Sequence, residues 1–121
     1  MTSIGEFAFY GCTSVTSAVI GNGVTSVSYY MFGSCTNLKS VVIGDSVTSI
    51  SESAFHNCTK LNSIVIPNRV TNIGSNAFYL CNSLRNVYYT GSNEEWKTIS
   101  IASYNSPLTN ATIQYNYVSE E

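Results

Sequence analysis

Four cysteines carry the most reactive side chains of the chain, and their spacing limits the chemistry that they can support. They are Cys12, Cys35, Cys58 and Cys81, each 23 residues after the one before. If this spacing places them at equivalent points of adjacent coils, they lie about 4.8 Å apart with parallel side chains. A disulfide needs Cβ atoms about 3.5–4.5 Å apart that point toward each other. We therefore expect four buried, reduced and unligated thiols rather than disulfides.

The sequence contains no set of residues that is suited to metal binding or catalysis. Zinc sites use cysteines clustered as Cys-x-x-Cys or paired histidines, whereas this chain has one histidine, His56. Glu94 and Glu95 are adjacent, so on a helix their side chains diverge by about 100° and cannot share a reacting atom. The glycines at positions 21 and 23 indicate a turn between strands rather than a phosphate-binding loop. The sequence predicts no enzyme, no metal and no cofactor.

The whole chain is organised around a unit of 23 residues. The stretch Thr48–Val70, TSISESAFHNCTKLNSIVIPNRV, aligns without gaps with Thr25–Val47, Thr2–Val24 and Thr71–Tyr89. A fixed period of this length is typical of a solenoid, in which each unit is too short to bury its own apolar face and shares a core with its neighbours. Columns that stay apolar are predicted to face that core, among them Ile4, Val27, Ile50 and Ile73; Phe9, Phe32, Phe55 and Phe78; and Val15, Leu38, Leu61 and Leu84.

The repeated residues resemble a known class. Leu61–Ile66 reads L-x-x-I-x-I, the strand signature of leucine-rich repeats. The longer string V/I-T-x-I-x-x-x-A-F-x-x-C-x-x-L-x-x-V/I-x-I, carried by residues 2–89, resembles the BspA-like class of leucine-rich repeats. This resemblance implies a β-rich α/β solenoid: a right-handed coil with a parallel sheet, short helical turns and a C-terminal cap. Since the class is found on surface proteins of anaerobic bacteria and some parasitic protists, it also implies a cell-surface or secreted parent protein.

Within each repeat we expect two short strands and one turn of helix. The first strand, such as residues 40–43, should form the parallel sheet and end at Gly44 or Pro67, because glycine favours turns and proline lacks a ladder donor. The second extended piece, residues 47–50, should run along another face. Residues 53–57 suit a single helical or 3₁₀ turn that carries a phenylalanine into the core.

The period is lost after residue 89, which divides the chain into four repeats, residues 1–89, and a C-terminal capping segment, residues 90–121. Ser92 is predicted to cap a short helix, with Glu95 completing a capping box. Residues 111–117 alternate like a last strand. Two apolar residues of this segment are expected to cover the last repeat: Trp96 and Ile99, against Phe78 and Leu84.

Charge and hydropathy argue against two classes of partner. With a net charge of −2 and five Lys and Arg residues, the chain has no electrostatic footprint for nucleic acid or for an anionic membrane. No apolar run approaches the about 20 residues that span a bilayer. The N-terminus lacks the basic head and apolar core of a signal peptide. We expect a fragment of a longer secreted or surface chain, because residue 2 falls partway through a repeat.

Binding is the function that the pattern favours. Along the first strands, outward residues form an apolar column with a polar border, which resembles a recognition surface. The alternative is that β-branched residues simply suit strands. Because leucine-rich repeats usually bind through this sheet, we predict a protein–protein or surface-adhesion module for a protein or glycan ligand, with Tyr88 as the best anchor. Six residues are candidate contacts: Lys39, Val42, Asn62, Val65, Arg85 and Tyr88. The competing hypothesis is a structural spacer or terminal stalk of a longer array.

The N-terminal end of the array suggests a second kind of contact. No repeat precedes the segment that begins at residue 2, so the apolar columns and the strand of residues 16–20 are expected to be uncovered there. An open strand edge is a template for pairing. We therefore expect self-association through the first repeat, most simply as a two-fold homodimer.

Overall fold

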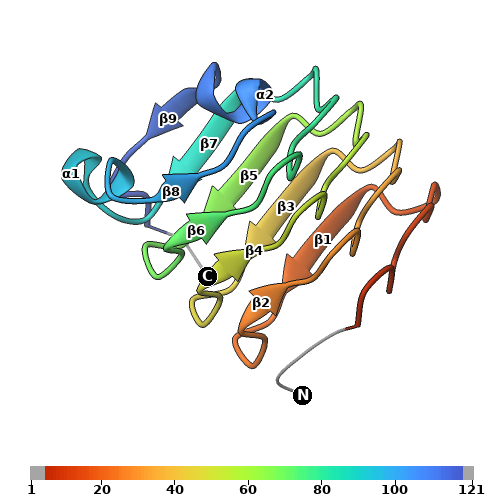
Figure 1. The fold of residues 1–121 in the computed structure, drawn as a ribbon, viewed down its shortest axis with the longest axis horizontal. Coiled ribbons are helices and arrows are strands. Elements are labelled where there is room, and N and C mark those ends of the chain that lie inside the picture. The colour runs from red at the N-terminus through yellow and green to blue at the C-terminus, as the bar shows by residue number, and fades with distance from the viewer. Residues whose placement is uncertain (1–4, 119–121) are drawn as a thin grey trace.

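Two parallel sheets form the walls of a stacked coil in the computed structural model, which describes residues 5–118 (Figure 1). The larger sheet contains β1 (Ser17–Ile20), β3 (Ser40–Ile43), β5 (Ser63–Ile66), β7 (Asn86–Tyr89) and β9 (Thr112–Gln114), in that order. The smaller sheet contains β2 (Ser26–Val27), β4 (Ser49–Ile50), β6 (Asn72–Ile73) and β8 (Ser100–Ile101). Four successive coils each contribute one strand to each sheet, and β9 adds a fifth strand to the larger one, which confirms the solenoid fold.

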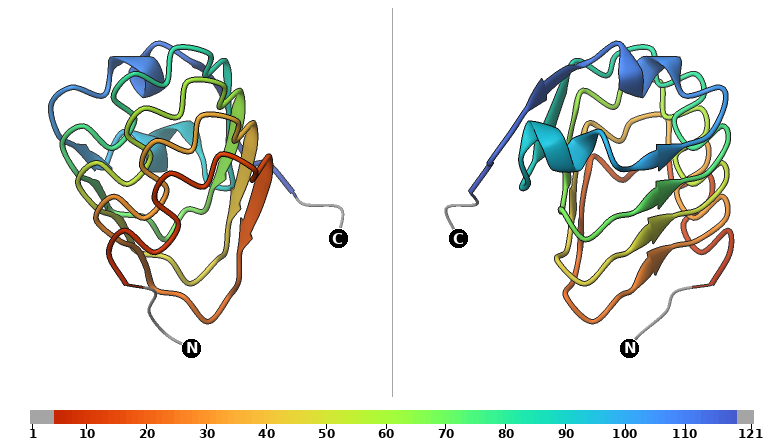
Figure 2. Two further views of the ribbon diagram at one scale, coloured as in Figure 1. Left: turned by 90° about the vertical axis from the view of Figure 1, so that its right-hand side faces the viewer. Right: turned by 60° about the vertical axis from the view of Figure 1, so that its left-hand side comes forward.

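The sequence period becomes the register of the sheets. Ser17 pairs with Ser40, and Ser40 with Ser63, so each strand lies beside the residues 23 positions away. Seen from two further directions, the successive coils lie over one another, with the sheets on different sides of a shared interior (Figure 2). Within residues 5–118, no helix is long and apolar enough to cross a membrane.

Alternation along the strands separates core from surface as predicted. In β3, Val41 and Ile43 are buried while Val42 between them is exposed. Strands β3 and β5 end immediately before Gly44 and Pro67. After the first coil, the predicted columns of phenylalanine and leucine fill the interior, where Phe55, Phe78 and Leu61 have no exposed surface. Phe9 of the first coil is 39% exposed, and Ile4 lies outside the described residues. Neighbouring phenylalanines stack with ring centroids 5.3–5.4 Å apart.

The corner between the smaller and the larger sheet differs from the expected turn of helix. Along residues 53–58, backbone N–H groups donate alternately to the next coil and to their own coil: Phe55 to Ala77 of the next coil at 2.8 Å, and His56 to Ser53 of its own at 3.1 Å. In a helix that continued through the segment, successive N–H groups would all donate back to carbonyls of the same segment. The prediction of a helical turn in each repeat is therefore wrong, because coil-to-coil bonding takes every second donor.

This alternation requires left-handed backbone at two positions of each corner. One series is Phe7, Tyr30, Ser53 and Asn76, with φ of 52–61°; the other is Gly11, Ser34, Asn57 and Leu80, with φ of 56–69°. Glycine and asparagine adopt this region readily, whereas a bulky side chain there is unusual. The aromatic members of the first series are considered further below.

The cysteines form a ladder of thiol hydrogen bonds. Sγ of Cys35, Cys58 and Cys81 each donates to a phenylalanine carbonyl of the preceding coil at 3.1 Å. These three thiols are buried, and all four cysteines are free. The prediction of burial is wrong for Cys12, which is half-buried because no described coil covers the first corner.

Residues 90–118 continue the coil with a longer spacing. Helix α1 (Asn93–Trp96) has the predicted capping box, in which Ser92 and Glu95 exchange hydrogen bonds. Strand β8 pairs with β6 at an offset of 28 residues, from Asn72 to Ser100. After α2 (Ser106–Thr109), β9 pairs with β7 and extends the larger sheet.

A buried asparagine closes the last corner. Asn105 is 3% exposed, and its Oδ1 accepts from the backbone N–H of Phe78 at 3.0 Å, where a carbonyl of the next coil serves in earlier repeats. Its Nδ2 donates to the carbonyls of Gly74 and Ala102. Trp96, which we expected over Phe78 and Leu84, lies instead against Tyr89 with ring centroids 5.0 Å apart. A polar side chain, rather than an indole, therefore meets Phe78.

We predict that Cys12 is alkylated before the other three thiols in the native protein. Burial raises the pKa of Cys35 to about 11, and a hydrogen bond with Cys81 together with burial raises the pKa of Cys58. The thiolate is the reactive form, so a raised pKa slows alkylation of Cys35 and Cys58 at neutral pH, and burial shields Cys81 from the reagent. Timed iodoacetamide labelling at neutral pH with peptide mass spectrometry measures the order. In denaturant without reductant all four should react, and finding two or none would contradict the thiol ladder.

We also predict that Asn105→Ala lowers the free energy of unfolding by about 2–3 kcal/mol, because it leaves buried backbone groups without partners. Urea unfolding followed by circular dichroism measures this loss. The exposed Asn110→Ala provides a control for removal of an amide near the same helix. Equal small losses in the two variants would show that closure of the last corner does not depend on Asn105.

Candidate functional site

An exposed row of valines crosses the outer face of the larger sheet. The register places Val19, Val42 and Val65 side by side on β1, β3 and β5, and brings Tyr88 of β7 next in line. Val19 is 72% exposed, Val42 is 36% exposed and Val65 is half-buried. Since the inward neighbours of these residues already fill the core, the row is not needed to build the interior. It offers apolar surface to a partner.

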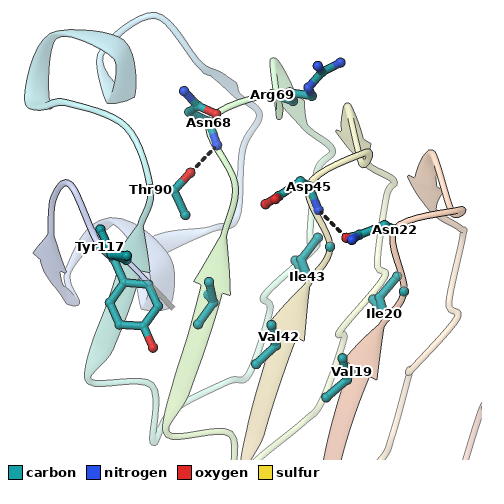
Figure 3. A pocket seen from close by; sticks show the side chains of 14 residues that line it. Val19, Ile20, Asn22, Val42, Ile43, Asp45, Asn68, Arg69, Thr90 and Tyr117 are labelled. Carbon is teal, nitrogen blue, oxygen red and sulfur yellow. Dashed lines mark hydrogen bonds between the residues drawn. The ribbon is translucent and has the colours of Figure 1, made fainter. Parts of the chain in front are cut away.

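The valines form the floor of a groove of about 690 Å³ (Figure 3). One side is lined by the turns that follow the strands, and the far end by the segment after β9. Figure 3 shows Val19 and Val42 on neighbouring strands with Tyr117 across from them. A volume of this size is within the range of about 300–1,000 Å³ typical of ligand sites. The principal lining residues are Val19, Val42, Val65, Asn22, Asp45, Asn68, Arg69, Thr90 and Tyr117.

Tyr117 is held at the end of the groove by backbone hydrogen bonds. Its N–H donates to the carbonyl of Tyr89 at 2.9 Å, and the preceding Asn116 donates to Gly91 at 2.8 Å. The ring of Tyr117 lies 5.0 Å from that of Tyr88, centroid to centroid. Tyr88, the predicted anchor, is therefore half-buried, and part of its surface is covered by an intramolecular contact with Tyr117.

Polar turn residues form the upper edge of the groove. Asn22, Asp45 and Asn68 occupy the same position in successive repeats. Oδ1 of Asn22 accepts from the N–H of Asp45 at 3.2 Å, and Oγ1 of Thr90 accepts from the N–H of Asn68 at 2.9 Å. Asp45 and Arg69 add one charge of each sign to this edge. A partner that crosses the valines therefore meets hydrogen-bonding groups along one border.

The six predicted contact residues lie in two places. Val42 and Val65 line the groove, and Tyr88 adjoins it through Tyr117. The polar residues Lys39, Asn62 and Arg85 precede the strands instead of following them. They line a separate shallow hollow of about 510 Å³, which also contains Lys60. Here the Nζ of Lys60 donates to Oδ1 of Asn37 at 3.2 Å. The structure thus divides the predicted site into an apolar groove and a basic hollow.

The groove contains no arrangement suited to covalent chemistry. Among residues 5–118, no group of three His, Cys, Asp or Glu side chains could hold a metal ion. The raised pKa values belong to buried thiols and to tyrosines outside the groove, such as Tyr89, whose pKa is raised by burial and by Glu95. The groove offers a concave shape, apolar surface and hydrogen-bonding groups, which are the features that recognition uses.

The six contact residues predicted from the sequence do not include several residues that line the groove. The turn residues Asn22, Asp45 and Asn68 could have been added, because the carboxyl ends of parallel strands meet at one edge of a sheet. Tyr117 could not have been added, since its position depends on the path of the aperiodic segment after β9.

The profile of the BspA type leucine rich repeat region matches residues 1–119 in six copies. The chain belongs to the BspA-type leucine-rich repeat family. The match extends through residues 90–119, where the sequence period is lost but the strands still join both sheets. This family is a scaffold, so the fold follows from membership and the ligand does not.

Two solved structures resemble this BspA-type chain. A leucine-rich cell surface protein from Faecalibacterium prausnitzii A2-165 superposes with a TM-score of 0.81 and 36% identity, over 85% of this chain and 27% of the other. A leucine-rich repeat protein of T. pallidum has a TM-score of 0.73 and 24% identity, over 97% of this chain and 64% of the other. The chain therefore spans less than two thirds of either similar protein. No curated protein gives a significant match.

Proposed function

We propose that this BspA-type chain is a non-catalytic protein-binding module whose groove receives an extended segment of a partner. The observation that carries the proposal is the exposed valine row, which lies across three strands and is walled by Tyr117. An extended segment placed across the strands would bury its apolar side chains on the valines. Its polar groups would then face Asn22, Asp45 and Asn68.

The proposal places the module at a cell surface, in an adhesive role. Its support is the similarity to a leucine-rich cell surface protein, together with membership of the family. A glycan is the second ligand class that the groove would accommodate, through the same polar edge. A spacer in a longer array is the competing function, and it requires no particular side chain at Val42.

We predict that Val42→Glu weakens ligand binding, because a carboxylate at the centre of the row would be desolvated by the partner. The wild-type chain would be screened against an array of purified extracellular proteins and glycans, and the affinity of each ligand found would then be measured by surface plasmon resonance. Val42→Glu should weaken binding at least tenfold, the effect of losing about 1.4 kcal/mol.

The matched control is Asn72→Glu, which adds the same charge to an exposed position on β6 of the smaller sheet. It should bind as the wild type does. If both variants keep every interaction of the wild type, or lose affinity equally, the groove is not the binding site and the spacer function gains support.

We infer further that two copies associate through the first coil. Within residues 5–118, β1 and β2 lie at the edges of their sheets, Phe9 is 39% exposed, and Val15 and Ala18 are half-buried. These residues and their neighbours line an apolar hollow of about 250 Å³. Two edge strands brought together by a two-fold axis would pair their backbones and cover this surface.

Val19→Lys should shift this equilibrium toward monomer, since lysine on an edge strand opposes pairing. Sedimentation velocity over a range of micromolar concentrations measures the change, with Val65→Lys, on a central strand of the same face, as the control. A wild-type chain that remains monomeric throughout would refute self-association.

A further inference from the structure

A cluster of four aromatic rings lies at the corner of the first two coils, away from the groove. Phe7 stacks on Tyr30 with centroids 5.1 Å apart and planes 3° from parallel. Tyr29 stands perpendicular to both rings, 5.6 Å from Phe7 and 4.7 Å from Tyr30. Tyr10 completes the cluster 5.5 Å from Phe7. We call these residues the aromatic corner.

The aromatic corner begins a row of rings along the whole stack. Tyr10, His56 and Tyr79 share one position of the repeat, but the second coil has Gly33 there. A Cβ on Gly33 would lie 2.6 Å from Cδ1 of Tyr30, so Tyr30 fills the space that a side chain at this position would use. The row then passes from Tyr10 to Tyr30, His56 and Tyr79 in steps of 5.3–5.9 Å.

Core packing does not account for these rings. Phe7 is 48% exposed and Tyr10 49% exposed. Phe7 and Tyr30 also have left-handed backbone, with φ of 58° and 52°, at the position where later coils have Ser53 and Asn76. Every corner adopts this backbone, so the unusual feature is the bulky aromatic residue at the position and not the conformation itself. Phe7 and Tyr30 therefore occupy backbone positions that polar residues would fill at lower cost.

The charges around the aromatic corner are negative. Glu6, Tyr29 and Glu52 occupy the same position in three successive coils, so the two glutamates flank Tyr29 on the neighbouring coils. The pKa of Tyr29 is raised by burial and by the nearby Tyr30, Glu52 and Glu6. All five Lys and Arg residues lie elsewhere: Lys39, Lys60 and Arg85 in the basic hollow, Arg69 at the groove and Lys97 after α1. A cation that reaches the corner meets no repulsion from a basic side chain.

We propose that the aromatic corner binds an arginine side chain of a basic segment of a partner protein. A guanidinium lies flat on aromatic faces and forms bidentate hydrogen bonds with carboxylates. The exposed faces of Phe7 and Tyr10 supply the first contact, and Glu6 and Glu52 supply the counter-charge. This site is separate from the groove, and it stands whether or not the groove binds a ligand.

The test uses a blocked peptide of alternating glycine and arginine as the probe, titrated by isothermal calorimetry at low ionic strength. The same peptide with citrulline in place of arginine keeps the shape and removes the charge. The arginine peptide should bind and shift the NMR resonances of Tyr29 and Tyr30, and the citrulline peptide should do neither. Equal binding of the two peptides would overturn the proposal.

Two variants locate the site. Glu52→Gln and Tyr10→Leu should each raise the Kd about three- to tenfold, by removing a counter-charge or a ring face. Glu94→Gln removes the same charge at the far end of the chain, where Glu94 takes no part in the capping box, and should leave the Kd unchanged. If Glu94→Gln weakens binding as much as Glu52→Gln, the attraction is a property of net charge and the aromatic corner is not a site.

A second copy of the chain is the other occupant of the aromatic corner that has to be distinguished from a foreign basic segment. Its basic hollow also presents cations, so Lys60→Gln and Glu52→Gln would both abolish a concentration-dependent association seen by sedimentation. That result would assign the corner to self-assembly and overturn the proposal of a foreign basic segment. Loss of peptide binding in Glu52→Gln, with unchanged sedimentation of both variants, supports it.

Discussion

Hydrogen bonding from each coil to the next is the constraint on which the rest of this molecule depends. Thr71 N–H donates to Thr48 of the preceding coil along one side, while at the corner Phe55 N–H donates to Ala77 of the following coil. Because buried backbone groups must find partners, every coil has to present donors and acceptors at the same height as its neighbour. An insertion inside a strand or a corner would displace these partners, whereas the longer segment between β7 and β8 leaves β8 paired with β6. The 23-residue period satisfies this constraint.

The same constraint decides which residues can vary. Inward positions repeat because one coil's side chains contact the equivalents in the next, as the stacked phenylalanines and the ladder of cysteine thiols do. Outward positions have no such requirement. The valine row, the basic hollow and the aromatic corner all lie among them. The surfaces that we propose for binding are therefore formed by side chains that the hydrogen-bond ladder leaves free to differ from coil to coil.

Much of the fold could be predicted from the sequence, since periodic columns identify the core and glycine or proline marks the strand ends. The capping box of Ser92 and Glu95 was readable because it depends on local spacing. The backbone conformation of the corners could not be predicted, because a short polar segment with alanine suits a helical turn when the adjacent coils are ignored. Only the adjacent coil shows that alternate N–H groups donate outward. The roles of Tyr117 and Asn105 could not be predicted for the same reason, because their partners lie in other coils and outside the period.

The candidate surfaces lie at different places around one coil, so each can be altered separately. The groove lies at the carboxyl ends of the strands of the larger sheet, the basic hollow at their amino ends, and the aromatic corner beyond the smaller sheet. Acidic and aromatic groups thus stand apart from most of the basic ones. Since the core between these surfaces repeats in every coil, a substitution on one surface need not disturb another. A fold with so few charges can in this way present separate chemistries to separate partners.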